Sequence, residues 1–88
     1  MSYEVKYTEA ALKQLKKMDK PTKNLIISYI EKNLIGVEEP RAKGKALIGN
    51  LSGLWRYRVE NYRIIADISD KEIVIFILEI NHRSKIYK

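Results

Sequence analysis

Residues 54–68 read LWRYRVENYRIIADI, and they predict the central hairpin of the fold. Apolar and polar side chains alternate on both sides of residues 60–61, a pattern that is typical of two half-buried strands. A connection of two residues joins antiparallel strands in a tight hairpin and thereby fixes their register. We therefore expect Arg58 to lie directly opposite Arg63.

This register divides the side chains of the hairpin between two faces. The face expected to line the core carries Trp55, Tyr57, Val59, Tyr62, Ile64, Ala66 and Ile68. The other face carries Arg56, Arg58 and Arg63, although like charges directly opposite each other destabilise a strand pair. Guanidinium groups suit phosphate oxygens, so this face predicts an anionic ligand. A solvated face, neutralised by Asp67 and Glu79, is the alternative interpretation.

The rest of the chain predicts two helices and two more strands. Residues 3–7 alternate like a strand, and Thr8 is suited to cap a helix. A second helix begins at Pro21 and ends before Gly36. A last strand covers residues 73–80. The resulting order β-α-α-β-β-β predicts an α+β fold, with an N-terminal helical hairpin packed on an antiparallel-rich, four-stranded sheet.

Composition limits the possible functions. The 88 residues include 17 Lys and Arg against 11 Asp and Glu, a formal net charge of +6 that favours an anionic partner such as nucleic acid. The absence of cysteine excludes disulfides and thiolate metal sites, and a single histidine makes an imidazole metal site unexpected. The longest apolar run, residues 73–78, is far shorter than the ~20 residues of a membrane-spanning helix. We expect one cytoplasmic domain that does not enter a membrane.

Two segments resemble the toxins of the RelE/YoeB type, within the RelE/ParE superfamily of type II toxin–antitoxin systems. Residues 47–65, LIGNLSGLWRYRVENYRII, resemble the central block of these toxins. Residues 79–87, EINHRSKIY, resemble their C-terminal block. Chain length and element order also agree. The resemblance implies a single RelE-like toxin domain over residues 1–88.

The same resemblance implies an enzyme, an mRNA interferase. Such toxins are ribosome-dependent endoribonucleases that cleave mRNA in the decoding site, without a metal or another cofactor. The RNA 2′-hydroxyl attacks the adjacent phosphate and leaves a 2′,3′-cyclic phosphate. The implied partners are the 70S ribosome with its mRNA and a RelB-like cognate antitoxin whose acidic C-terminal segment neutralises the toxin.

The resemblance also implies roles for individual residues. Its most recurrent catalytic arginine falls on Arg63, which we expect to be exposed on the sheet and to stabilise the negative transition state. Arg56 and Arg58 fall on basic, phosphate-binding positions of the preceding strand. The connection between the second helix and the hairpin adds Arg41 and Lys43 to the expected phosphate contacts.

The proton acceptor has two candidates. His82 is the single histidine, a residue type suited to proton transfer, and it falls on a C-terminal catalytic position of the family, together with Arg83 and Tyr87. Lys45 is the second candidate, because a lysine crowded by other cations can act as a base. Both remain open at the level of sequence.

Two other functions compete with the ribonuclease. One is a gyrase-inhibiting toxin of the related ParE type, which shares the fold and lacks ribonuclease activity. The other is a non-catalytic nucleic-acid-binding module. The combination of Arg63, His82, Arg83 and Tyr87 favours the ribonuclease, because simple binding does not need that set at one place.

Overall fold

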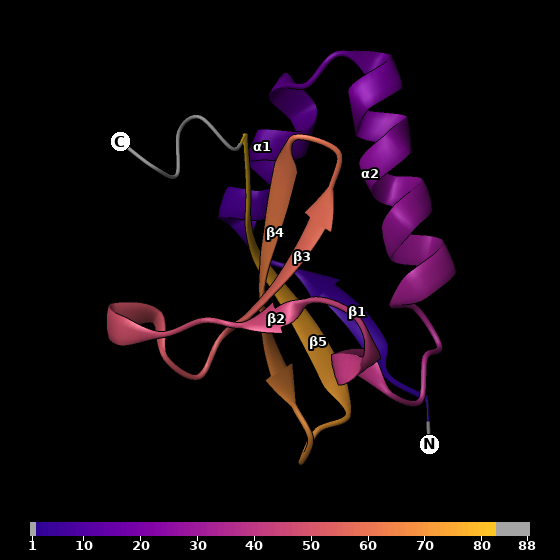
Figure 1. Cartoon of the computed structure of the whole chain (residues 1–88). Coiled ribbons are helices and arrows are strands. Elements are labelled where there is room, and N and C mark those ends of the chain that lie inside the picture. The colour runs from indigo at the N-terminus through magenta and orange to yellow at the C-terminus, as the bar shows by residue number, and fades with distance from the viewer. Residues whose placement is uncertain (1, 83–88) are drawn as a thin grey trace.

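The computed structural model describes residues 2–82, and Figure 1 shows how its elements are arranged. Two helices follow the first strand, and the remaining strands come after a long connection. In chain order the elements are β1 (Glu4–Tyr7), α1 (Glu9–Lys17), α2 (Lys20–Asn33), β2 (Lys45–Ala46), β3 (Trp55–Val59), β4 (Tyr62–Ser69) and β5 (Val74–His82). Two short 3₁₀ helices, η1 (Pro40–Ala42) and η2 (Gly49–Leu51), flank β2. The α+β class is confirmed.

The strands form one mixed sheet in the order β1-β5-β4-β3-β2. Strand β1 runs parallel to β5, and the other neighbours are antiparallel. The register of the β3–β4 hairpin is as expected, with Arg58 opposite Arg63 and Arg56 opposite Ile65. Glu60 takes a positive φ of 55° in the two-residue connection, where such conformations favour a tight hairpin.

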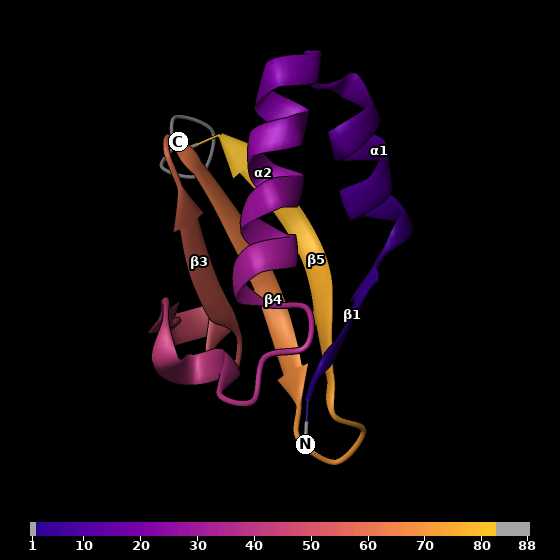
Figure 2. The same ribbon diagram turned by 90° about the vertical axis from the view of Figure 1, so that its right-hand side faces the viewer.

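Both helices cover the same face of the sheet (Figure 2). Their apolar sides meet the inward side chains of the central strands, because each element can bury only one face. The buried core consists of Ala11, Leu15, Ile26, Ile30, Leu34, Tyr57, Val59, Ile64, Ala66, Ile75, Ile77 and Ile80. Trp55, Tyr62 and Ile68 pack against this core while partly exposed, so the inner face of the hairpin is as expected. No helix within residues 2–82 combines the length and the apolarity that a membrane span requires.

The expected strand count is corrected from four to five. The connection between α2 and β3 does not remain irregular, because Lys45 and Ala46 pair with Arg56 and Trp55 to form β2. This strand has only two residues, too few to show an alternating pattern in the sequence. Its pairing nevertheless fixes one end of the connection against the edge of the sheet.

A β-bulge changes the direction of the side chains at the end of β5. Ile65 pairs with Glu79 while the next residue, Ala66, pairs with Ile77, so Leu78 is the extra residue. Side chains alternate along a strand, and one extra residue reverses which face the following residues occupy.

The edge of β5 beyond β1 is covered by α1. Thr8 Oγ1 donates to the Leu78 carbonyl at 2.9 Å, and Gln14 Oε1 accepts from the Ile80 amide at 2.6 Å.

Candidate functional site

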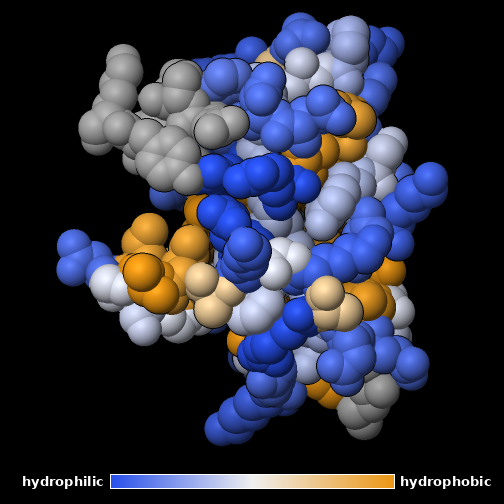
Figure 3. Space-filling view, in the orientation of Figure 1, coloured by the Kyte–Doolittle hydropathy of each residue, from blue (hydrophilic) through white to orange (hydrophobic). Residues whose placement is uncertain are grey.

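The candidate site lies on the face of the sheet that the helices leave uncovered. Lys45 is opposite Arg56 in the β2–β3 ladder, and Arg58 is opposite Arg63 in the β3–β4 ladder. Since opposed residues share a face, and so do residues two apart, all four cations belong to the same surface. We call Lys45, Arg56, Arg58 and Arg63 the basic face. Strongly hydrophilic side chains occupy the middle of this side of the molecule in Figure 3.

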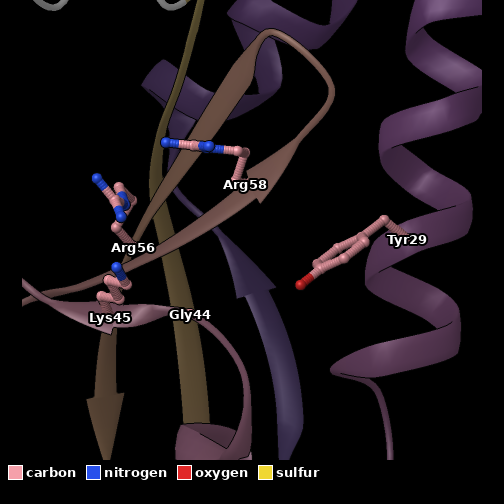
Figure 4. A pocket seen from close by; sticks show the side chains of 5 residues that line it. All are labelled: Tyr29, Gly44, Lys45, Arg56 and Arg58. Atoms are coloured by element: carbon pink, nitrogen blue, oxygen red, sulfur yellow. The ribbon is translucent and has the colours of Figure 1, made fainter.

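Three of these cations line a shallow pocket of about 260 Å³. Its lining consists of Tyr29, Gly44, Lys45, Arg56 and Arg58. Figure 4 shows the ends of Lys45 and Arg56 lying close together, with Arg58 on the neighbouring part of β3 and the Tyr29 hydroxyl directed from α2 toward the same space. Two guanidinium groups and an ammonium group beside an open pocket can bind an anion with several oxygens, such as a phosphodiester.

Arg63 differs from its expected surroundings. It lies at the centre of the basic face, opposite Arg58 on β3 and opposite Asn81 on β5. Only 4% of its surface is exposed, so the expectation of an exposed sheet arginine is wrong. Arg63 is flanked by the side chains of Arg58 on β3 and Asn81 on β5, whereas Arg58 lies beyond the β2 pairing, which ends at Arg56. Burial fixes the guanidinium in place but makes Arg63 part of the packing.

Two of the expected phosphate contacts are engaged elsewhere. Arg41 donates two hydrogen bonds to the Asp70 carboxylate, at 2.9 and 3.0 Å. These bonds, with a further one from the Tyr3 hydroxyl, hold the pKa of Asp70 below its usual value. Lys43 Nζ donates to Asn33 Oδ1 at 2.6 Å. Arg41 and Lys43 therefore tie the α2–β3 connection to its neighbours, and neither of them lines the pocket.

His82 is not brought together with the arginines. It lies opposite Tyr62, and the two rings meet edge to face with their centroids 5.1 Å apart. Tyr62 packs against the core, on the helix side of the sheet. The bulge at Leu78 accounts for this placement, because it shifts the pairing by one residue and moves His82 from the face of Arg63 to the face of Tyr62. Arg83 and Tyr87 lie outside the described residues.

Sequence reasoning missed two residues of the site. Tyr29 of α2 is not among the residues expected at the site, yet it lines the pocket, and partial burial raises the pKa of its phenol. Asn81 lies beside Arg63, and its side chain accepts from Gln14 Nε2 at 3.0 Å and donates to Glu79 at 3.3 Å. The aromatic residue could have been suspected from its polar hydroxyl. The position of Asn81 depends on the bulge, which has no signature in the sequence.

An apolar loop borders the basic face. Ile48 is 86% exposed and Leu51 is 49% exposed in the segment between β2 and β3. In Figure 3 these apolar side chains gather on the part of the molecule that projects to the left. Exposed apolar groups beside charged ones are typical of surfaces that meet another macromolecule.

Comparisons with known proteins agree with the fold and the resemblance. A family model described as the ParE toxin of type II toxin–antitoxin systems, parDE, matches residues 5–87. The chain is 30% identical to the toxin RelG of Mycobacterium tuberculosis over 88 residues, which are 100% of this chain and 99% of that protein.

Solved structures show the same architecture. The toxin–antitoxin complex RelBE2 of Mycobacterium tuberculosis contains a chain with a TM-score of 0.84 and 28% identity, and the match covers 94% of this chain and 100% of that one. The archaeal RelE–RelB complex of Pyrococcus horikoshii matches with a TM-score of 0.71 and 27% identity, and the match covers 97% of this chain and 99% of that one. The isolated RelE toxin of E. coli matches with a TM-score of 0.74 and 21% identity, and the match covers 98% of this chain and 92% of that one. At this identity the match supports the fold alone. The chain belongs to the ParE toxin family of type II toxin–antitoxin systems and is a toxin with the RelE fold.

Proposed function

We propose that this toxin is a ribosome-dependent endoribonuclease that cleaves mRNA in the decoding site. The observation that carries the proposal is the basic face, where Lys45, Arg56, Arg58 and Arg63 come together on three neighbouring strands. Such a concentration of like charge is costly within a sheet unless an anion neutralises it. An RNA phosphodiester supplies that anion, and Tyr29 lines the pocket in which it would lie.

The proposed reaction is an internal transfer of the phosphoryl group. The RNA 2′-hydroxyl loses its proton to a base, and its oxygen forms a bond to the adjacent phosphorus. The bond from phosphorus to the 5′ oxygen breaks, and that oxygen takes up a proton. The products are a 2′,3′-cyclic phosphate and a 5′-hydroxyl. Negative charge grows on the non-bridging oxygens in the transition state, where the fixed guanidinium of Arg63 stabilises it together with Arg58.

The ribosome supplies orientation in this proposal. Guanidinium groups stay protonated and accept no proton, so the basic face contributes charge more readily than acid–base chemistry. Holding the mRNA so that the 2′-hydroxyl is in line with its phosphate can supply a large part of the rate enhancement. Metal ions and cofactors have no role in this scheme.

We assign proton transfer on the basic face to Lys45 rather than to His82. Lys45 lines the same pocket as the arginines, whereas His82 contacts Tyr62 on the helix side. Lys45→Met should lower single-turnover cleavage on programmed ribosomes by about 10²-fold, which is typical for the loss of a proton-transfer group. His82→Gln should retain activity within about threefold, well short of that effect.

The two variants control each other in that assay, since each removes one titratable side chain. A large loss with His82→Gln and a small one with Lys45→Met would move proton transfer to His82 and contradict our assignment. The proposed participation of Arg83 and Tyr87 is tested in the same way, by Arg83→Ala and Tyr87→Phe.

We further propose that a RelB-like antitoxin with an acidic C-terminal segment silences the toxin. Such segments fold when they bind, and Asp and Glu side chains would neutralise the basic face. Ile48, exposed beside that face, offers an apolar contact to the same segment. The solved complexes RelBE2 and archaeal RelE–RelB, which contain antitoxins, support this partner.

Salt should weaken this association strongly, because exposed charges are screened within about 10 Å at 0.1 M salt. Replacing Arg56 and Arg58 by Gln should flatten the dependence of the dissociation constant on salt, measured by calorimetry. Replacing Lys13 and Lys16, which are exposed on α1, by Gln is the matched control and should leave the slope nearly unchanged. Equal slopes for both double variants would contradict docking on the basic face.

A gyrase-inhibiting toxin is the second candidate function, since the matching family model is that of the ParE toxin. Two assays separate the candidates. A ribonuclease toxin stops protein synthesis in a purified translation system and leaves DNA supercoiling by purified gyrase unchanged. Inhibited supercoiling with intact translation would favour the gyrase toxin and overturn the proposal.

A further inference from the structure

The segment that carries Lys45 rests on two aromatic side chains of β3. Tyr57 is fully buried, and its hydroxyl donates to the Pro40 carbonyl at 2.5 Å. Trp55 Nε1 donates to the Lys43 carbonyl at 2.7 Å. These bonds reach residues 40 and 43, which precede Gly44 and Lys45 in the chain. The aromatic residues that alternate with Arg56 and Arg58 therefore do more than fill the core.

Gly44 lets the segment approach the indole closely. Its φ of +81° belongs to the left-handed region, and a methyl group there would collide with the Arg56 carbonyl oxygen. The same methyl group would lie 2.7 Å from Trp55 Nε1. The chain thus turns over the indole at Gly44, and the next residue, Lys45, pairs with Arg56. Trp55 itself is opposite Ala46 in the same ladder.

We propose that Trp55 and Tyr57 are positioning residues of the basic pocket, which hold the segment 40–45 by its backbone carbonyls and so place Lys45 beside Arg56. This inference rests on the proposed role of Lys45. It gives the pocket wall, which comes from a connection with only two residues in β2, two further attachments to β3. Burial raises the pKa of Tyr57 to about 12, so its hydroxyl remains a donor over the working range of pH.

Trp55→Phe tests the proposal, because it keeps an aromatic ring and removes the N–H donor. Cleavage of ribosome-bound mRNA is measured for the wild type, Trp55→Phe, Lys45→Met and the double variant. If the indole acts through Lys45, Trp55→Phe slows the cleavage step about tenfold in the presence of Lys45. In the Lys45→Met background the same change should lower the rate of the cleavage step by less than about twofold, because the side chain through which Trp55 acts is already absent.

Equal losses in the two backgrounds would overturn the positioning role, since a general effect on the fold does not depend on Lys45. Ile77→Val, a mild change in the core away from the segment, serves as the control and should give equal effects in both backgrounds. Thermal unfolding of each variant shows that the comparison is made between folded proteins.

A second readout does not need enzymatic activity. Trp55 is the single tryptophan, so its indole N–H gives one resolvable NMR signal. In the wild type this proton should exchange with solvent at least about tenfold more slowly than in an unfolded peptide, since opening the bond is required. Exchange at the peptide rate would overturn the hydrogen bond to Lys43. Slow exchange in a protein that cuts no mRNA would instead preserve the bond and refute the proposed function.

Discussion

Arg63→Ala is expected to abolish cleavage and also to destabilise the fold. The guanidinium lies at the centre of the basic face, where loss of one fixed positive charge should lower single-turnover cleavage by about 10²–10³-fold. Because Arg63 is 4% exposed, truncation also removes packed side-chain atoms. The free energy of unfolding should fall by about 1–2 kcal/mol, the loss of packing being partly offset by relief of repulsion with Arg58.

Arg63→Lys separates the two effects. It keeps the positive charge and much of the side-chain volume but lacks the planar fork that binds two phosphate oxygens. We expect near wild-type unfolding by denaturant and cleavage that remains at least about tenfold impaired. Arg41→Ala is the matched control, because that arginine binds Asp70 away from the pocket and should leave the cleavage rate almost unchanged. Full activity of Arg63→Ala would remove this residue from the mechanism.

Gly44→Ala should have the second largest effect. The added methyl group meets the Arg56 carbonyl oxygen and the Trp55 indole, neither of which can move without disturbing the β2–β3 pairing. With the left-handed conformation included, the free energy of unfolding should fall by about 2–4 kcal/mol. Cleavage should fall at least about tenfold, because Lys45 follows directly in the chain and a small displacement is costly to catalysis.

Gly36→Ala isolates the contribution of the packing. Gly36 has a φ of +75°, close to the value of Gly44, but no atom lies within 4 Å of an added methyl group. We expect a loss of only about 1–2 kcal/mol in chemical denaturation, from the backbone conformation alone, with normal cleavage. If both alanine variants behaved alike in stability and activity, the close approach at Gly44 would have no functional consequence.

The central hairpin could be predicted in detail from the sequence. A two-residue connection leaves little freedom of register, so the opposition of Arg58 and Arg63 follows from the position of residues 60–61. Alternation then assigns Trp55 and Tyr57 to the core side. The cap at Thr8 is also confirmed, since its Oγ1 accepts from the Ala11 amide at 3.2 Å. In these cases the interactions that decide the structure are local.

The rest of the site depends on interactions between distant segments. The bulge at Leu78 arises in the pairing of β4 with β5, and it places His82 on the helix side and Asn81 beside Arg63. Regular alternation along β5 would have placed His82 on the basic face. The contact of Arg41 with Asp70 spans 29 residues, and nothing in the local pattern distinguishes that arginine from a phosphate ligand. Charge alone predicts an anionic ligand but does not indicate which cations line the pocket.

The proposed attack by the RNA 2′-hydroxyl is tested on the ribosome with an mRNA that lacks this single hydroxyl. Ribosomes are programmed with either the natural mRNA or one carrying a 2′-deoxynucleotide at the cut position, and the same RNA without ribosomes is the control. We predict a cut only in the ribosome-bound natural mRNA, ending in a 2′,3′-cyclic phosphate. The cut should be the same with and without a chelator, at chelator levels that leave the ribosome intact. Comparable cutting of the free RNA, or of the 2′-deoxy mRNA, would contradict the proposed mechanism.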